Sequence, residues 1–375
     1  MKRSLVLGLV LLAACADDGT SNGNFTPAPQ ALAVSGDFDM TGVLTRLDLT
    51  TMDVAQNIGG TGAVSGDPVI RRIGDRVYVI NRSGGNSVTV FDAETLAFVD
   101  QFGTGAGSNP QDVAIVGTAL YVPAMGTSGV VKINSTTGAV STIALPLDVV
   151  DDLPDCISAY AVGTKVYIAC GLLDENFSAR GPGVVAVLDT TTDTVMTTVT
   201  LPTPNPYNFI VKSPATSVFG GDLLIALLPS FTDYSTGCVA RVSTGATPTA
   251  SCAAGLLNSH LDGTVIHMDV ATDGSYLYLA VGRLDANFEN PAGALRRLDL
   301  ATGVLRTQPL SPRTQMIQDV AACSDGSVVV ADGTFGTAGL RLYNRDALEV
   351  TTAPLAIGLP PTFGNALVCY NAAQP

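Results

Sequence analysis

The sequence predicts an all-β fold, a seven-bladed β-propeller made of four-stranded antiparallel blades. Three observations support this prediction: the composition, a repeated four-strand unit, and the spacing of that unit along the chain. Of the 375 residues, 39 are Gly and 21 are Pro, and only 14% are charged. This composition suits many short strands joined by tight turns.

The repeated unit is an apolar strand, a turn, a second strand of the Val-Tyr-Val type, a loop, a third strand ending in a polar residue, a turn and a fourth strand. Six second strands are plain, at 77–80, 120–122, 166–169, 223–226, 277–280 and 328–331. Seven third strands end at Asp48, Asp92, Asn134, Asp189, Ser243, Asp299 and Asn344, spaced by 44, 42, 55, 54, 56 and 45 residues. This spacing is the period of a four-stranded propeller blade.

The two ends of the domain are predicted to share one blade. Segments 31–35, 42–48 and 52–58 supply three strands of a blade that lacks its innermost strand. Segment 365–370 resembles the first strands at 112–116 and 319–323, so we expect it to fill that place. Sharing a blade closes the ring and removes the free sheet edges that invite aggregation.

Several segments resemble the surface-layer type of repeat propeller, the YVTN or YncE-like group. They are Val77-Tyr78-Val79-Ile80-Asn81, the strand entry Asn109-Pro110-Gln111-Asp112-Val113, and the Asp-Xaa-Thr-Thr turns. The resemblance covers nearly the whole chain after residue 30 and implies a propeller. Its motifs specify how blades are built, and members of the group differ in activity, so the resemblance does not fix a function.

The N-terminal residues are predicted to form a lipoprotein signal peptide, 1–14, and a flexible tether, 15–30, ahead of the propeller domain, 31–375. Lys2 and Arg3 precede an apolar run that is typical of a secretory signal and shorter than the roughly 20 residues a membrane span needs. The tetrapeptide Leu12-Ala13-Ala14-Cys15 resembles the lipobox of bacterial lipoproteins, which implies acylation of Cys15. An ordinary cleaved signal is the alternative.

The environment and partners follow from this anchor and from the charge. Ala16 rather than Asp follows the cysteine, which by resemblance to lipoprotein sorting rules implies the outer membrane, on its periplasmic side or at the cell surface. Removal of Lys2 and Arg3 leaves 17 basic against 33 acidic residues, a net charge of −16. Nucleic acid is not expected as a partner, because binding it requires cations that neutralise phosphates. We expect a monomer attached to the membrane by lipid, with a protein, peptide or glycan partner.

Six cysteines remain after Cys15, an even number that suits disulfides in an oxidising compartment. Cys156 and Cys170 lie symmetrically about a glycine in a first-to-second strand hairpin. Cys238 and Cys252 do the same in a third-to-fourth strand hairpin. Each pair is predicted to be directly opposed, with Cα atoms roughly 4.5 to 5.5 Å apart, a separation that a disulfide can span.

A third bridge is predicted between Cys323 and Cys369, which fall at corresponding positions of the innermost strands of the last and first blades. Those two strands are neighbours around the ring. Buried free thiols are the alternative for all three pairs.

Long loops indicate which face of the propeller is expected to bind a partner. Because strands in a blade alternate in direction, second-to-third strand loops emerge on the same side as the connectors between blades. We call this side the loop face, and the opposite side the hairpin face. Loops 172–183, 229–237 and 283–293 of blades four to six are long, and the acidic connector 148–155 joins them. A raised lobe over one half of the ring is expected, and such loops usually carry binding.

The candidate binding residues in these loops are Asp174, Asn176, Phe177, Phe231, Asp233, Tyr234, Asp285, Asn287 and Phe288. The phrase Gly-Xaa-Leu-Asp-Xaa-Asn-Phe occurs twice, at 171–177 and 282–288. In one interpretation its Asp and Asn oxygens bind Ca²⁺ or a polar ligand, and Phe offers contact surface. In the interpretation that we favour, Asp and Asn cap the turn while Phe packs onto the blade.

The sequence offers few residues in arrangements typical of a catalytic site. His260 and His267 are the two histidines, and we expect them to pack or to form hydrogen bonds rather than to bind zinc. No Gly-Xaa-Ser-Xaa-Gly nucleophile motif occurs. The predicted function is a binding or scaffold module that uses the loop face. The alternative is an envelope hydrolase or lyase with a metal in the propeller channel.

Overall fold

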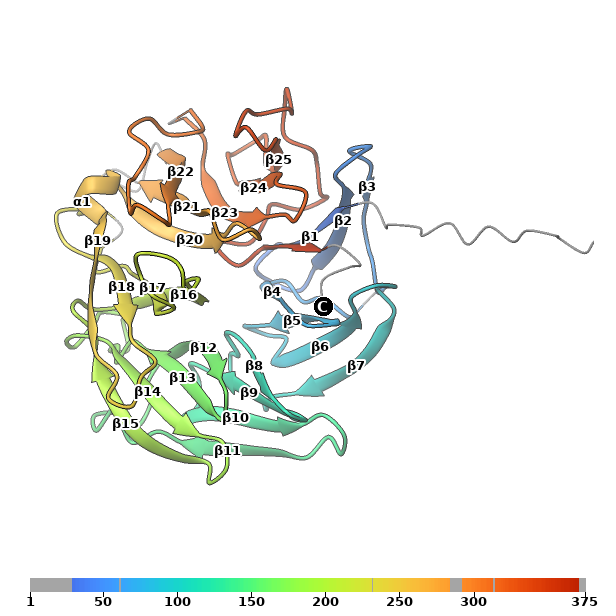
Figure 1. The fold of residues 1–375 in the computed structure, drawn as a ribbon. Coiled ribbons are helices and arrows are strands. Elements are labelled where there is room, and N and C mark those ends of the chain that lie inside the picture. The colour runs from blue at the N-terminus through green and yellow to red at the C-terminus, as the bar shows by residue number, and fades with distance from the viewer. Residues whose placement is uncertain (1–28, 61, 231, 284–291, 313, 371–375) are drawn as a thin grey trace, which may run out of the picture.

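The computed structural model describes residues 29–370, apart from 61, 231, 284–291 and 313. Their strands form seven separate antiparallel sheets that follow one another around a ring (Figure 1). The described residues include one short helix, α1 (Asn258–Leu261). The predicted seven-bladed β-propeller is confirmed.

The first four blades each have four strands. Blade 1 contains β26 (Leu367–Tyr370), β1 (Gln30–Gly36), β2 (Gly42–Asp48) and β3 (Val54–Ala55). Blade 2 contains β4 (Pro68–Ile73), β5 (Arg76–Asn81), β6 (Ser87–Asp92) and β7 (Phe98–Gly103). Blade 3 contains β8 (Ala114–Val116), β9 (Ala119–Pro123), β10 (Gly129–Asn134) and β11 (Val140–Ala144). Blade 4 contains β12 (Cys156–Val162), β13 (Lys165–Cys170), β14 (Val184–Asp189) and β15 (Thr194–Thr200).

The remaining three blades complete the ring. Blade 5 contains β16 (Pro206–Lys212), β17 (Leu223–Leu227), β18 (Cys238–Val242) and β19 (Ala250–Leu257). Blade 6 contains β20 (Thr264–Val270), β21 (Tyr276–Arg283) and β22 (Ala292–Asp299). Blade 7 contains β23 (Ile317–Ala322), β24 (Val328–Asp332) and β25 (Gly339–Tyr343). In blades 6 and 7 isolated bridges stand in place of a fourth strand, at Leu298–Leu305, Leu340–Leu355 and Tyr343–Glu349.

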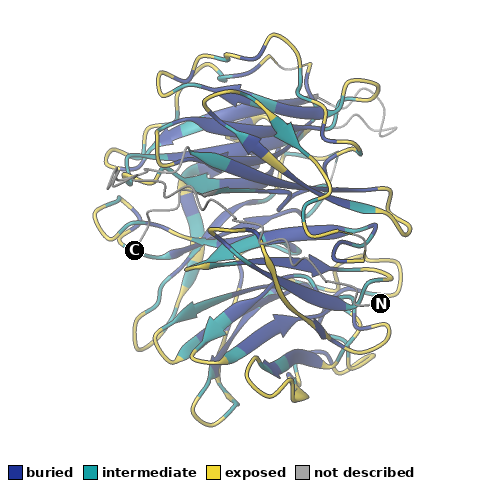
Figure 2. Cartoon of the chain, turned by 90° about the vertical axis from the view of Figure 1, so that its right-hand side faces the viewer, coloured by how far each residue is buried: buried dark blue, intermediate teal, exposed yellow. Residues whose placement is uncertain are grey.

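The position of a strand within its blade follows from its apolar pattern. The second strand β5 reads Arg-Val-Tyr-Val-Ile-Asn and is buried from Val77 to Asn81, because neighbouring blades cover both of its faces. The outer strand β7 is exposed at most positions. Figure 2 shows this distribution, with buried strands inside and exposed loops at the two faces.

The Asp-Xaa-Thr-Thr segments form the third-to-fourth strand turns. In blade 1 the Asp48 carboxylate accepts hydrogen bonds from the backbone N–H groups of Thr50 (2.8 Å) and Thr51 (2.9 Å). Asp92, Asn134, Asp189, Asp299 and Asn344 accept equivalent bonds in blades 2, 3, 4, 6 and 7. A short Asp or Asn side chain that accepts a hydrogen bond from the backbone N–H two residues later stabilises a tight turn. This explains why Asp or Asn recurs at this position of the blades.

The predicted ring closure is confirmed. β1 lies between β2 and β26 and pairs with β26 in antiparallel register, with Ala31 opposite Cys369 and Leu32 opposite Val368. The blue and red ends of the chain thus meet in one sheet (Figure 1). The strand expected over 52–58 is shorter than predicted, because the backbone bonds between Asp48 and Asp53 extend the turn up to Asp53.

All three predicted disulfides are present. The Cα atoms lie 3.8 Å apart for Cys156–Cys170, 5.8 Å for Cys238–Cys252 and 5.0 Å for Cys323–Cys369. Cys156 and Cys170 are directly opposed, as predicted. The predicted opposition of Cys238 and Cys252 is wrong, because a register shift in the β18–β19 pair places Ala240 opposite Cys252.

Within the described part of the chain, no helix has the length and apolar character that a membrane crossing requires.

The Cys323–Cys369 bridge is expected to stabilise the closure of the ring. Replacing both cysteines with Ala should lower the free energy of unfolding by about 2–4 kcal/mol, since a disulfide restricts the unfolded chain. Urea titration of the oxidised protein measures this. The matched Cys238→Ala/Cys252→Ala variant, which joins strands inside one blade, should lose less because its loop is shorter. An equal or larger loss in the matched variant would contradict the expectation.

Candidate functional site

At the hub of the ring, polar side chains of one blade accept hydrogen bonds from backbone N–H groups of the next blade. We call these contacts the hub ladder. Asp112 accepts from Ala159 (2.9 Å), Ser158 from Ile210 (2.8 Å), Asp269 from Ala322 (2.8 Å) and Asp319 from Leu367 (2.7 Å). Each contact satisfies a buried backbone group and fixes one blade against its neighbour.

Three residues of the innermost strands follow a β-bulge, and two of them, Ser158 and Asp319, belong to the hub ladder. The pairing of the first and second strands shifts register between Cys156 and Ser158, between Val265 and His267, and between Ile317 and Asp319. A bulge places an extra residue in one strand and redirects the side chains that follow it. The bulges therefore direct Ser158, His267 and Asp319 to positions that regular strand alternation would not give.

A buried ion pair joins blades 2 and 3 at the hub. Arg71 Nη2 donates to Asp112 Oδ2 at 2.8 Å, and Arg71 Nε lies 2.6 Å from Oδ1. The Asp112 side chain is fully buried, and Ser158 Oγ also donates to it at 2.7 Å. The guanidinium of Arg71 stacks on the ring of Phe209, 4.1 Å from its centroid.

A histidine and an aspartate join blades 6 and 7. His267 Nδ1 contacts Asp319 Oδ1 and lies 3.2 Å from the backbone oxygen of Val320. The His267 ring also contacts the edge of Phe209, with centroids 6.3 Å apart. Burial lowers the pKa of His267, but the carboxylates of Asp319 and Asp269 and the Val320 carbonyl together more than offset this, so the net pKa is raised. The expectation that His267 forms hydrogen bonds is confirmed.

The channel is crossed near its loop-face end. Asn365, just before β26 in blade 1, donates through Nδ2 to Asn208 Oδ1 at 3.2 Å and accepts from the Phe209 N–H at 3.3 Å. Tyr207 and Phe363 meet edge to face beside them, with ring centroids 6.2 Å apart. Blades 1 and 5 therefore touch across the ring at this level.

Below this crossing lies a channel cavity of about 260 Å³. It is lined by Ile70, Arg71, Arg72, Phe209, Ile210, Val211, His267, Met268, Asp269, Ala322, Leu367, Val368 and Cys369. Most of these residues lie in the middle or second half of an innermost strand, which places the cavity on the hairpin-face side of the crossing. Burial raises the pKa of Asp269 to about 6, although the hydrogen bond from the Ala322 N–H lowers it.

Across residues 29–370, leaving aside the positions not described, no three His, Cys, Asp or Glu side chains are grouped so that they could hold a metal ion.

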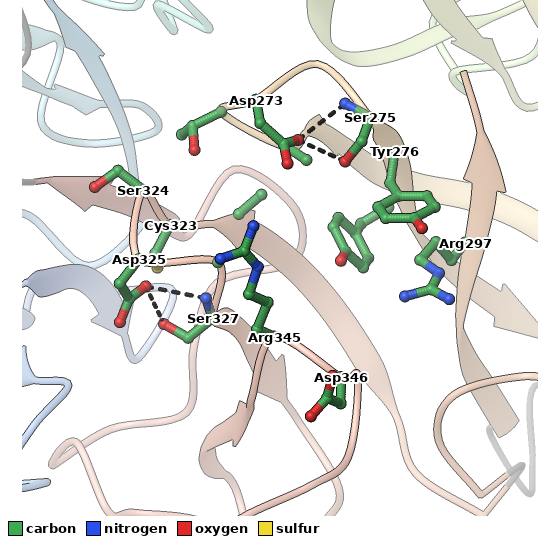
Figure 3. Close-up of a pocket in the computed structure, with 15 residues that line it drawn as sticks. Asp273, Ser275, Tyr276, Arg297, Cys323, Ser324, Asp325, Ser327, Arg345 and Asp346 are labelled. Carbon is green, nitrogen blue, oxygen red and sulfur yellow. Dashed lines mark hydrogen bonds between the residues drawn. The ribbon is translucent and has the colours of Figure 1, made fainter. Parts of the chain in front are cut away.

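A second hollow, of about 470 Å³, lies between blades 6 and 7 on the hairpin face (Figure 3). Asp273 caps its own turn by accepting from Ser275 N (2.9 Å) and Oγ (2.5 Å), and Asp325 does the same with Ser327. Arg345 extends between these two turns in Figure 3. Two of the carboxylates of this interblade hollow, those of Asp273 and Asp325, are therefore already engaged in stabilising their turns.

On the loop face, blade 4 carries a compact projection made of connector 148–155 and loop 172–180. We call it the blade 4 lobe. Arg180 joins its two segments, with Nη1 2.5 Å from Asp148 Oδ2 and Nη2 2.7 Å from Asp151 Oδ2. Asp155 Oδ2 accepts from the Leu173 N–H at 2.7 Å. Burial raises the pKa of Asp155 to about 6.

Apolar side chains at the surface of the lobe are exposed. Val149 is 91% exposed, and Val150 and Phe177 are each 70% exposed. The Asp174 carboxylate accepts from the N–H groups of Asn176 and Ser178, both at 2.9 Å, so it caps the turn as the favoured interpretation expects. The other half of that interpretation is wrong, because Phe177 does not pack onto the blade. Phe177 has a positive φ of 58°, and the turn directs it to solvent.

The remaining predicted loop residues are only partly described. Asp233 Oδ1 accepts from the Ser235 N–H at 2.9 Å, and Tyr234 lies 5.7 Å from the guanidinium of Arg283. Phe231, Asp285, Asn287 and Phe288 lie outside the described residues.

The sequence prediction missed the hub. Asp112, Asp319 and Asn365 each stand directly before an apolar triplet, Val-Ala-Ile, Val-Ala-Ala and Ala-Leu-Val. This repeated polar position was the available signal. Its partners could not be predicted, because they belong to other blades.

No protein-family model and no curated protein matches this chain. Similar solved structures include apo AztD from Citrobacter koseri, with 11% identity, a TM-score of 0.55, and coverage of 92% of this chain and 99% of its own. A functionally unknown protein from Desulfotomaculum acetoxidans has 13% identity, a TM-score of 0.56, and coverage of 92% and 99%. A protein from Bacteroides fragilis, provisionally named a 6-phosphogluconolactonase, has 12% identity, a TM-score of 0.57, and coverage of 92% and 98%. Such likeness shows a shared fold alone.

The Arg71–Asp112 pair is expected to be a large contributor to the stability of the hub. Asp112→Asn should lower the free energy of unfolding by about 3–5 kcal/mol, because it leaves the Arg71 charge in the hub without its counter-ion. The control is Asp262→Asn, whose partner Arg283 is half exposed, and which should cost about 0–1 kcal/mol. Urea unfolding at pH 7 measures both, and equal losses would contradict the assignment.

Proposed function

We propose that the protein is an envelope-anchored lipoprotein whose propeller binds a protein partner through the blade 4 lobe. The observation that carries this proposal is the exposure of Val149, Val150 and Phe177 on the two segments of one projection. Exposed aromatic and aliphatic side chains on a fixed scaffold are the usual energetic centre of a protein interface. The similar proteins named above support only the fold.

The lobe is well suited to binding because its backbone is already fixed. Arg180 ties the loop to the connector through two aspartates, and a bridge between Leu173 and Ala179 closes the loop into a small hairpin. A surface that is ordered before binding loses less conformational entropy in the complex.

The charge of the lobe indicates the chemistry of its partner. Asp151, Asp152 and Glu175 are exposed around the apolar side chains. Complementary charge guides association and excludes unsuitable partners. We therefore expect the partner to present apolar residues flanked by Lys or Arg, rather than nucleic acid or an acidic surface.

The anchor completes the proposal. Acylation of Cys15 and a tether over residues 15–30 would hold a monomeric propeller at the outer membrane, on its periplasmic side or at the cell surface. A glycan or free peptide at the same lobe is the alternative occupant. We propose that this binding uses no cofactor, with the Asp174 carboxylate serving to cap its turn through Oδ1.

The lobe is tested by selecting ligands from a random displayed-peptide library with the purified domain. We expect enriched peptides with apolar centres and basic flanks. Phe177→Ser should weaken their binding by about tenfold or more, as truncation of an interface anchor does. Phe98→Ser, at a 53% exposed position on the outer strand of blade 2, is the matched control. Unchanged affinity in Phe177→Ser would refute the lobe as the binding surface.

Lipid attachment is tested separately with Cys15→Ser. The full chain, expressed in a bacterium, should partition into detergent and incorporate a labelled fatty acid. The variant should remain aqueous and unlabelled, because the acyl chains provide the membrane affinity. Labelling that survives Cys15→Ser would exclude this anchor.

A further inference from the structure

The channel cavity is a separate site from the blade 4 lobe. Contacts between Asn365 and both Asn208 and Phe209 cross the channel between the cavity and the loop face. At about 260 Å³ the cavity is slightly smaller than the roughly 300 Å³ at which pockets for drug-sized ligands begin. It therefore suits a compound of the size of an amino acid or a small amine.

Asp269 is the acid in the cavity wall that lacks a basic partner. Its Oδ1 accepts from its neighbour Val270 (2.9 Å) and its Oδ2 from Ala322 (2.8 Å). No Lys or Arg of the described residues forms an ion pair with it, and the positive group that influences it is His267. By contrast, Arg71 on the opposite wall is already neutralised by Asp112.

The remaining walls favour an apolar body. Phe209, Met268 and Val368 line the cavity, and Phe209 and Met268 are almost fully buried. The charged groups around Asp269 are His267 on its own strand and Arg71 and Arg72 on β4. Asp319 on β23 contacts His267. Asp269 is half-buried, and a carboxylate beside apolar walls is the arrangement that recognises an ammonium group on an organic body.

From this geometry we propose that the channel cavity binds a small organic cation. Its ammonium group pairs with the Asp269 carboxylate, and its apolar body lies against Phe209, Met268 and Val368. Pairing supplies a counter-ion to the half-buried carboxylate, so the contact between the two charges is stronger than the same contact in water.

Binding should depend on pH in a defined direction. The pKa of Asp269 is about 6, so the carboxylate is charged at pH 8 and mostly protonated at pH 5. Loss of this negative charge weakens the binding of a cation, so affinity should fall as pH is lowered from 8 to 5.

The test uses benzylamine, which stays protonated over this range, with benzyl alcohol as its uncharged analogue and benzoate as an anion. Isothermal titration calorimetry of the whole domain at pH 8 should show benzylamine binding about tenfold or more tightly than benzyl alcohol. Asp269→Asn should remove this preference, and Asp262→Asn should retain it. Affinity for benzylamine should also fall by about tenfold at pH 5.

Several outcomes would overturn the proposal. They are equal affinity for benzylamine and benzyl alcohol, preference for benzoate, no detectable benzylamine binding at millimolar concentration, or unchanged binding in Asp269→Asn. If Asp269→Asn does not fold, the comparison of the three compounds on the native protein still decides. Phe177→Ser should bind benzylamine normally, so failure at the lobe and failure at the cavity are distinguishable.

Discussion

The structure depends on polar side chains placed at the crowded centre of the ring. Each blade is a small sheet that cannot be stable alone, and its innermost strand has one edge without a strand partner. In the hub ladder, Asp112, Ser158, Asp269 and Asp319 supply acceptors to the backbone of the next blade. Since unpaired buried N–H groups are costly, these contacts fix the position and orientation of neighbouring blades. Asp269 also lines the channel cavity, and Asp112 holds Arg71 in its wall, so these residues contribute both to stability and to the proposed site.

The two candidate sites differ in how they are built. The blade 4 lobe is a surface projection whose order comes from Arg180 and its two aspartates. The channel cavity is a hollow in the rigid hub, formed by strands from five blades. A projection suits a large partner because it meets no steric barrier, whereas a small hollow selects by size and charge. The crossing at Asn365 separates the two, so occupation of one need not obstruct the other.

Much of the architecture could be predicted from local patterns. The spacing of third strands gave the number of blades, and the likeness of segment 365–370 to other first strands located the closure. Two disulfides followed from hairpin symmetry and the third from corresponding positions in neighbouring innermost strands. The shift at Cys238 shows that a bulge can alter register without preventing the bond. The contacts of the hub residues were not predictable, because the bulges before Ser158, His267 and Asp319 direct these side chains across blades, and strand alternation does not reveal that. Phe177 was misplaced because a turn conformation, not apolarity, decides its exposure.

The pairing of β1 with β26 has a consequence for how the chain is made. β1 emerges from the ribosome long before the partner that covers its inner edge. During that interval the edge offers unpaired backbone groups that another chain could bind. Contacts between such distant segments also form slowly, since a long loop must close first. The completed molecule is free of this hazard, but the nascent one must be shielded from its neighbours until its last strand arrives.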